Sequence, residues 1–190
     1  MEENHIFTFI EGENVNLVPT SAENAKLIAK WMNDPKVRKF SRNAMPRSLD
    51  EIKKWFEPQD NEGVPEHIVF NIWHKKDKKL IGTAGLNHIN WLNRWANAFL
   101  QIGELEYWNQ NIATEATKLI LKYAFEEVNL NKVSGGVAVD NIGSWKVAEK
   151  AGFTFEGILK EEFYVDGEYI DTKRYRFLRE DWFRQKNKEL

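Results

Sequence analysis

Apolar residues recur with two different periods along the chain, and the change of period separates helices from strands. In the first third, residues 25–32 and 52–56 place apolar side chains at helical spacing after Ser21 and Ser48. Serine is a favoured helix N-cap, and Ser48 has a glutamate three residues later, as in a capping box. The stretch 15–18 alternates apolar and polar residues, which predicts a short half-buried strand before the first helix.

From residue 67 onward the pattern changes to strands. Apolar runs alternate with charged or polar turns, which is typical of an antiparallel meander; the runs are 67–73, 80–89 and 98–102. Near the C-terminus two further runs flank Asp166 and Gly167, a dipeptide that suits the type I′ turn of a hairpin. Residues 179–190 are predicted to form a frayed polar helix.

One stretch in the middle of the chain passes from strand to helix through a polar turn. The turn is 108–111, and a helix with two apolar stripes begins at Ile112 or Ala113. A strand that leads directly into a helix presents unpaired N–H groups and the positive end of the helix dipole, which suits a phosphate group. A strand at 132–139 and a short helix ending near Gly152 follow. This strand-helix-strand order favours parallel pairing of the strands on either side of the long helix.

Composition excludes several classes of function. The 190 residues predict one domain, 1–190, and the 27 Lys and Arg against 29 Asp and Glu give a net charge of -2, so nucleic acid is not an expected partner. The absence of cysteine rules out disulfides, thiolate metal sites and a cysteine nucleophile. The scattered histidines predict no metal site, and the lack of a signal peptide or long apolar run predicts a cytoplasmic protein without a membrane partner.

Four stretches, taken in order, resemble the GNAT acyltransferase superfamily, in particular its RimJ/RimL-type branch of ribosomal-protein N-terminal acetyltransferases. They are Trp31 to Pro35, Glu106 to Ala116, Asn141 to Ser144 with Glu149 to Phe153, and Glu156 to Leu159 followed by Tyr169 to Asp171 and Trp182. The resemblance implies a mixed α/β (α+β) fold with a mostly antiparallel twisted sheet of about seven strands flanked by helices. It also implies that the sheet is splayed between the fourth and fifth strands, where the pantetheine arm of acetyl-CoA lies.

The same resemblance implies an activity. Acetyl passes directly from acetyl-CoA to a primary amine in a ternary complex, without an acyl-enzyme, and the acceptor is a protein N-terminus or a small-molecule amine. The oligomeric state is left as monomer or homodimer. The residues that the resemblance assigns to the cofactor are Ile102, Leu105, Trp108, Asn109, Gln110, Asn111, Ile112, Ala113, Thr114, Asn141, Ser144 and Lys150.

The turn departs from the family pattern at Asn109 and Asn111, where glycine is usual. Asparagine tolerates the left-handed conformation better than most residues, so the turn is expected to persist with some crowding near the pyrophosphate. The replaced glycines predict weaker CoA binding, and they also motivate the alternative function, a CoA-binding regulatory module that keeps the fold with little or no turnover. A further alternative is that Asn111 merely caps a helix that binds nothing.

Three residues are candidates for the chemistry. The resemblance places the Ser144 hydroxyl near the CoA sulfur, where it could protonate the thiolate, although Ser144 also fits a plain first-turn position behind a capping Asn141. Glu104 and Glu162 are candidates for the general base, or else solvated surface carboxylates. The segment 37–46 is either a solvated loop or, with Arg38, Arg42 and Glu62, part of the acceptor side.

Overall fold

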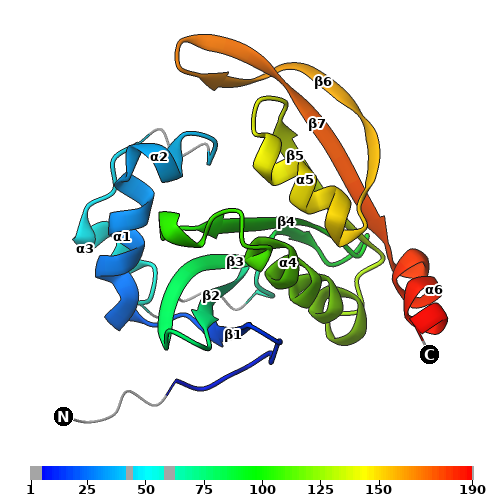
Figure 1. Cartoon of the computed structure of the whole chain (residues 1–190), viewed down its shortest axis with the longest axis horizontal. Coiled ribbons are helices and arrows are strands. Elements are labelled where there is room, and N and C mark those ends of the chain that lie inside the picture. The colour runs from blue at the N-terminus through cyan, green and yellow to red at the C-terminus, as the bar shows by residue number, and fades with distance from the viewer. Residues whose placement is uncertain (1–5, 42–44, 58–62, 190) are drawn as a thin grey trace.

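The structure is a computed structural model, which describes residues 6–41, 45–57 and 63–189. In this part of the chain seven strands form one sheet in the order β1-β2-β3-β4-β5-β7-β6 (Figure 1). The strands are β1 Val15–Pro19, β2 Ile68–His74, β3 Lys79–Asn90, β4 Trp95–Ile102, β5 Lys132–Ala138, β6 Thr154–Val165 and β7 Glu168–Leu178. All neighbours are antiparallel except β4 and β5, so the predicted meander, the parallel pair and the fold class are confirmed.

Helices enclose two hydrophobic cores. They are α1 Ala25–Asn33, α2 Pro35–Arg38, α3 Leu49–Lys54, α4 Ile112–Lys122, α5 Ile142–Ala151 and α6 Arg179–Glu189, with short turns η1 Ala22–Asn24, η2 Leu105–Tyr107 and η3 Tyr123–Glu127. In β1, Leu17 belongs to the main core with α4, whereas its neighbour Val18 belongs to a smaller core with Ile28 and Ile52 of α1 and α3. Because successive side chains of a strand point to opposite faces, α4 and the α1–α3 group cover different faces of the sheet.

The caps and turns follow the sequence signals at several places. Ser48 and Glu51 form the complete capping box at the start of α3. Asp166 and Gly167 have φ of 52° and 93°, and a type I′ turn needs positive φ at both central residues, so the predicted hairpin turn is confirmed. The hairpin β6–β7 arches away from the rest of the sheet, with α6 at its base (Figure 1).

Two local features were not predicted. The segment after α1 does not begin as a loop, because the Asp34 side chain accepts hydrogen bonds from the N–H groups of Lys36 and Val37 and so starts α2. The long helix also widens in its last turn, where the Val128 N–H donates to the Tyr123 carbonyl over 3.0 Å, a π-helical contact. No helix in the described ranges is long and apolar enough to cross a membrane.

Candidate active site

The parallel strands β4 and β5 are hydrogen-bonded neighbours over a short stretch only. They pair at three positions, the last of which joins Asn97 to Ser134. Beyond it β4 continues to Ile102 along β3, and β5 continues to Ala138 along β7, but β4 and β5 no longer pair with each other. The sheet is therefore splayed between its fourth and fifth strands, as the sequence resemblance implied.

Backbone groups of β4 face the side from which β5 has diverged. The N–H of Gly103 donates to the Ile81 carbonyl of β3 over 2.8 Å. Alternate residues of a strand direct their N–H and C=O groups to opposite neighbours, so Ile102 points its groups away from β3. Its carbonyl accepts a hydrogen bond of 2.9 Å from the indole Nε1 of Trp108. Its N–H group is directed at the splayed side, where the chemistry of acyl transfer needs a donor for an oxyanion.

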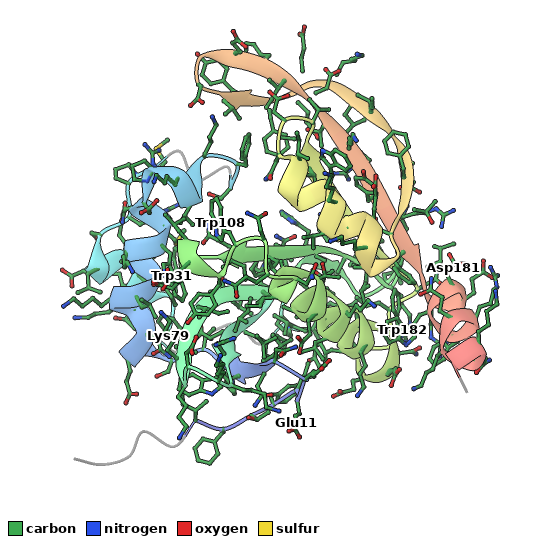
Figure 2. The ribbon with its side chains drawn as sticks, viewed as in Figure 1. Glu11, Trp31, Lys79, Trp108, Asp181 and Trp182 are labelled. Atoms are coloured by element: carbon green, nitrogen blue, oxygen red, sulfur yellow. The ribbon has the colours of Figure 1, made fainter. Side chains whose placement is uncertain are left out.

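The turn after β4 adopts the left-handed conformation that its asparagines allow. Asn109 and Asn111 have φ of 61° and 60°. The expectation that asparagine can replace glycine in this turn is thus confirmed for the backbone. The Gln110 side chain, although exposed, folds back onto the preceding η2, where its Nε2 donates to the carbonyl of Glu106. Trp31 and Trp108 both lie where β4 ends (Figure 2).

The start of α4 is not capped by its asparagine, which corrects the capping interpretation of Asn111. Asn111 occupies the N-cap position without a side-chain capping bond, and its Oδ1 instead accepts a hydrogen bond of 3.1 Å from Nζ of Lys150 on α5. The N–H groups of Ile112, Ala113 and Thr114 come first in the helix and have no carbonyl of the preceding turn to donate to. The helix end therefore keeps its donors and the positive end of its dipole available to an anion.

The start of α5 is closed by its own asparagine. Oδ1 of Asn141 accepts a hydrogen bond of 3.2 Å from the Ser144 N–H. Ser144 is half-buried in the first helical turn, and its hydroxyl has no hydrogen-bond partner among the residues that the structure describes. The structure thus brings Asn141 and Ser144 together, and it joins α5 to the α4 turn through Lys150.

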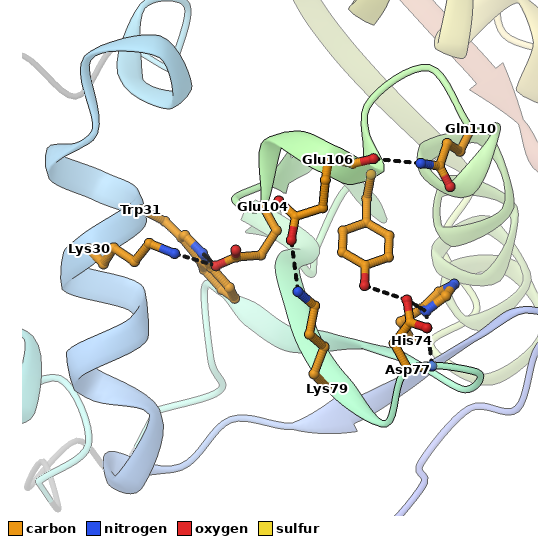
Figure 3. Close-up of polar contacts among 9 residues, drawn as sticks. Lys30, Trp31, His74, Asp77, Lys79, Glu104, Glu106 and Gln110 are labelled. Atoms are coloured by element: carbon orange, nitrogen blue, oxygen red, sulfur yellow. Dashed lines mark hydrogen bonds and ion pairs between the residues drawn. The ribbon is translucent and has the colours of Figure 1, made fainter.

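Glu104 is tied to helix α1. Its Oε1 accepts hydrogen bonds from Nζ of Lys30 over 2.8 Å and from Nε1 of Trp31 over 2.7 Å (Figure 3). Burial alone would raise the pKa of Glu104, but these two donors outweigh burial and hold the pKa below its ordinary value. The Trp31 ring reaches this position because Gly103 has no Cβ, which would lie 2.1 Å from the ring. A carboxylate with a lowered pKa is a weaker base than an ordinary one.

Other predicted site residues lie where their side chains serve the fold. Ile112 is buried in the main core, so only its main chain is available to a ligand, and Leu105 is partly buried against the smaller core. Glu162 is exposed on β6, within the stretch between Leu159 and Phe163 where the register with β7 is irregular.

A cavity of about 290 Å³ lies between the end of α2, the start of α5 and the tip of the β6–β7 hairpin; its lining is Lys39, Phe40, Asp140, Val165, Asp166, Glu168 and Ile170. Nζ of Lys39 is 2.8 Å from Oδ2 of Asp166. This hydrogen bond raises the pKa of Lys39, which stays an ammonium. Part of the segment 37–46 therefore forms a cavity wall, while Arg42 and Glu62 lie outside the described residues.

Several of these contacts could not have been found from sequence spacing. Trp31 follows a helical stripe and reads as a core residue, and nothing near it in the chain indicates that it holds Glu104. Nothing in the sequence relates Lys39 to Asp166, which with Gly167 indicates only a hairpin turn. No cluster of three or more possible metal ligands occurs in the ranges 6–41, 45–57 and 63–189.

A seven-stranded mixed sheet that opens at its parallel pair, ahead of a strand-turn-helix with free N–H groups, defines the fold of the GNAT acetyltransferases. Residues 14–154 match the family described as Acetyltransferase (GNAT) domain. The chain belongs to this family, and it is accordingly an N-acetyltransferase whose acetyl donor is acetyl-CoA.

Known relatives and structures agree with this assignment. The chain is 33% identical over 135 residues to the probable N-acetyltransferase YjcK of Bacillus subtilis, covering 68% of this chain and 71% of YjcK. It is 29% identical over 166 residues to the putative ribosomal N-acetyltransferase YdaF of the same species, covering 84% and 82%. The crystal structure of spermidine N-acetyltransferase from Vibrio cholerae in complex with CoA and spermine superposes with a TM-score of 0.81 at 26% identity, covering 90% of this chain and 99% of that one.

Proposed function

We propose that this acetyltransferase moves acetyl directly from acetyl-CoA to a primary amine in a ternary complex, without an acyl-enzyme. The observation that carries the proposal is the divergence of β4 from β5 directly before a turn and helix whose N–H groups are open. The absence of cysteine is consistent with direct transfer. We further propose that residues 1–190 act as one domain of the RimJ/RimL-type branch, because the four motifs occur in that branch's order.

In this proposal, different parts of the cofactor bind to the diverging strands and to the starts of α4 and α5. The pantetheine arm pairs with the backbone of β4 up to Ile102, and the pyrophosphate binds the N–H groups of residues 112–114 above the turn 108–111. Lys150 supports the charge, since its Nζ already lies 3.1 Å from Asn111 in that turn. Asn141 contributes its Nδ2, because its Oδ1 is used by its own helix.

The chemistry needs an uncharged amine, a stabilised oxyanion and a proton for the departing thiolate. The Ile102 N–H is the proposed oxyanion donor, and the Ser144 hydroxyl is the proposed proton donor. Glu104 and Glu162 are the proposed alternatives for the base. Both hydrogen bonds to Glu104 end on Oε1, so Oε2 can still take a proton through water. Comparing the pH–rate profiles of Glu104→Gln and Glu162→Gln separates the two, because removing the base abolishes the acidic limb of the profile.

For the acceptor we propose a small cationic amine rather than a protein N-terminus. The cavity beside α5 is lined by three carboxylates and one ammonium, with apolar walls that suit methylene groups. An ammonium, that of Lys39, is already seated on Asp166 there. The relatives do not decide the matter, since one is named for spermidine and another is named a ribosomal acetyltransferase.

The proposal is tested by titrating acetyl-CoA into the protein by calorimetry and then following release of free thiol with a panel of amines. The panel should contain monoamines, diamines, polyamines and a peptide with a free N-terminus. Thiol release with the diamines and polyamines supports the proposal, and release with the peptide alone overturns the acceptor assignment. If the protein binds acetyl-CoA but releases no free thiol with any amine of the panel, the result favours the regulatory module instead. That alternative is weakened by the backbone of the turn, in which both asparagines take the conformation that glycine would supply.

A further inference from the structure

The turn proposed to bind pyrophosphate is anchored from the side opposite the splayed strands. Tyr107, which directly precedes it, is only 7% exposed, and its hydroxyl donates a short hydrogen bond to the carboxylate of Asp77. Asp77 lies in the tight turn between β2 and β3, 30 residues earlier in the chain. The acetyltransferase motifs leave this contact unexplained.

A second contact runs beside the first. Nζ of Lys79 is 2.8 Å from Oε1 of Glu106 and lies 4.8 Å from the centre of the Tyr107 ring. The carbonyl of the same Glu106 accepts the hydrogen bond from Gln110, which lies inside the turn. An unbroken series of contacts therefore leads from the β2–β3 hairpin through η2 to the turn (Figure 3).

His74 fixes the hairpin end of this series. Its Nδ1 lies 3.0 Å from Oδ2 of Asp77 and 3.3 Å from the Asp77 N–H, and its ring packs against Tyr107 at 4.8 Å between centroids. The hydrogen bond from the Tyr107 hydroxyl outweighs the opposing effect of burial and holds the pKa of Asp77 below its ordinary value. Asp77 is thus an ionised acceptor with several partners that fix its position.

The turn has a physical need for such support. Asn109 and Asn111 both sit at positive φ, where glycine would rest with less strain. Unfavourable backbone conformations persist only where several contacts with the surrounding structure hold them in place. The contacts to η2 meet this need from outside the turn.

We propose that the β2–β3 hairpin braces the cofactor turn, and that Tyr107 is the positioning residue through which it acts. The proposal rests on the proposed function, because it takes the turn as the site of the CoA pyrophosphate. In this protein the hairpin contacts stabilise a turn in which Asn109 and Asn111 both have the left-handed backbone conformation. Glycine at these two positions would adopt that conformation with less strain.

The test replaces Tyr107 by phenylalanine, which keeps the ring and removes the hydroxyl. We expect acetyl-CoA to bind about five- to tenfold more weakly by calorimetry, because only part of the contribution of this hydrogen bond to a charged group reaches the turn. The kcat at saturating acetyl-CoA should stay within about twofold, since the reacting groups are untouched. Tyr123→Phe is the matched control, because the Tyr123 ring packs between aromatic rings away from the turn, and its affinity should equal that of the wild type.

Two further variants distinguish a brace from general destabilisation. Asp77→Ala, which removes the acceptor, should weaken acetyl-CoA binding as Tyr107→Phe does. The double variant should be little worse than either single one, because both substitutions remove the same hydrogen bond. Asn109→Gly, introduced into Tyr107→Phe, should restore part of the affinity, since it lowers the strain that the brace opposes. Wild-type affinity in Tyr107→Phe, or no recovery with Asn109→Gly, overturns the brace. Failure of the wild type to bind CoA instead overturns the proposed function.

Discussion

Helices α4 and α5 both have an asparagine at the N-cap position, yet the two asparagines make opposite contacts. Asn141 keeps a negative φ of −83° and turns its Oδ1 onto the Ser144 N–H of its own helix. Asn111 has a φ of 60° and gives its Oδ1 to Lys150 of the other helix. In this protein the N-cap residue with negative φ closes the end of its helix, whereas the N-cap residue in the left-handed conformation leaves the helix end open.

This difference assigns the two helices different tasks in the proposed mechanism. The open end of α4 can receive the phosphates of the donor, whereas the closed end of α5 presents Ser144 to the reacting atoms. Asp140, directly before α5, also lines the cavity proposed for the acceptor. Donor recognition should then depend on the start of α4, and turnover and acceptor recognition on the start of α5.

The largest effect should come from a substitution at the capped start of α5. Ser144→Ala should lower kcat by about a hundredfold, the lower end of what a positioned proton donor contributes, while the affinity for acetyl-CoA changes little. Steady-state kinetics and calorimetry measure the two quantities. Ser144→Thr, which keeps a hydroxyl, is the control and should retain much of the activity. Unchanged turnover in a folded Ser144→Ala protein would remove this hydroxyl from the mechanism.

The next largest effect should come from a substitution at the uncapped start of α4. Asn111→Val places a β-branched residue at positive φ and removes the contact with Lys150, so acetyl-CoA should bind about tenfold more weakly, equivalent to ~1–2 kcal/mol. Asn111→Gly is the control. Glycine adopts the left-handed conformation without strain, so this variant should bind acetyl-CoA with an affinity close to that of the wild type. If Val and Gly variants bind acetyl-CoA equally, the left-handed turn does not matter for the donor.

Removing the cap of α5 should affect stability more than binding. Asn141→Ala should lower the free energy of unfolding by about 1 kcal/mol, the usual cost of losing an asparagine N-cap. The affinity for acetyl-CoA should fall less than in Asn111→Val, because Oδ1 of Asn141 already serves its own helix. Chemical denaturation and calorimetry on the same preparation measure both. A larger loss of affinity here than in Asn111→Val would reverse the assignment of the two helices.

The smallest effects should appear at the acceptor cavity. Asp166→Asn should raise the KM for a diamine about threefold, and Lys39→Ala should lower it by a similar factor. The effects are small because the ion pair between Lys39 and Asp166 is exposed, and the substrate ammonium must replace that of Lys39. The KM for acetyl-CoA should not change in either variant. Parallel shifts of the diamine KM in the two variants would contradict an exchange of cations on Asp166.

The sequence could predict the parts of this site that depend on local structure. The periodic apolar runs indicated the strands and helices, and the asparagines at 109 and 111 indicated a left-handed turn. The interaction of Asn111 could not be predicted, because its partner Lys150 is 39 residues away and the local rule favours a cap. The same holds for Glu104, whose partners Lys30 and Trp31 are more than 70 residues away and become neighbours only when α1 packs against the end of β4.

The central claim is that the start of α4 receives the donor while the start of α5 is already closed. It is tested most directly by titrating acetyl-CoA into isotope-labelled protein and following the backbone amide resonances. The account predicts large shifts for the amides of residues 112–114 and for Ile102, and a small shift for the amide of Ser144, which donates to Asn141. Large shifts confined to the start of α5, with residues 112–114 unmoved at saturation, would contradict it.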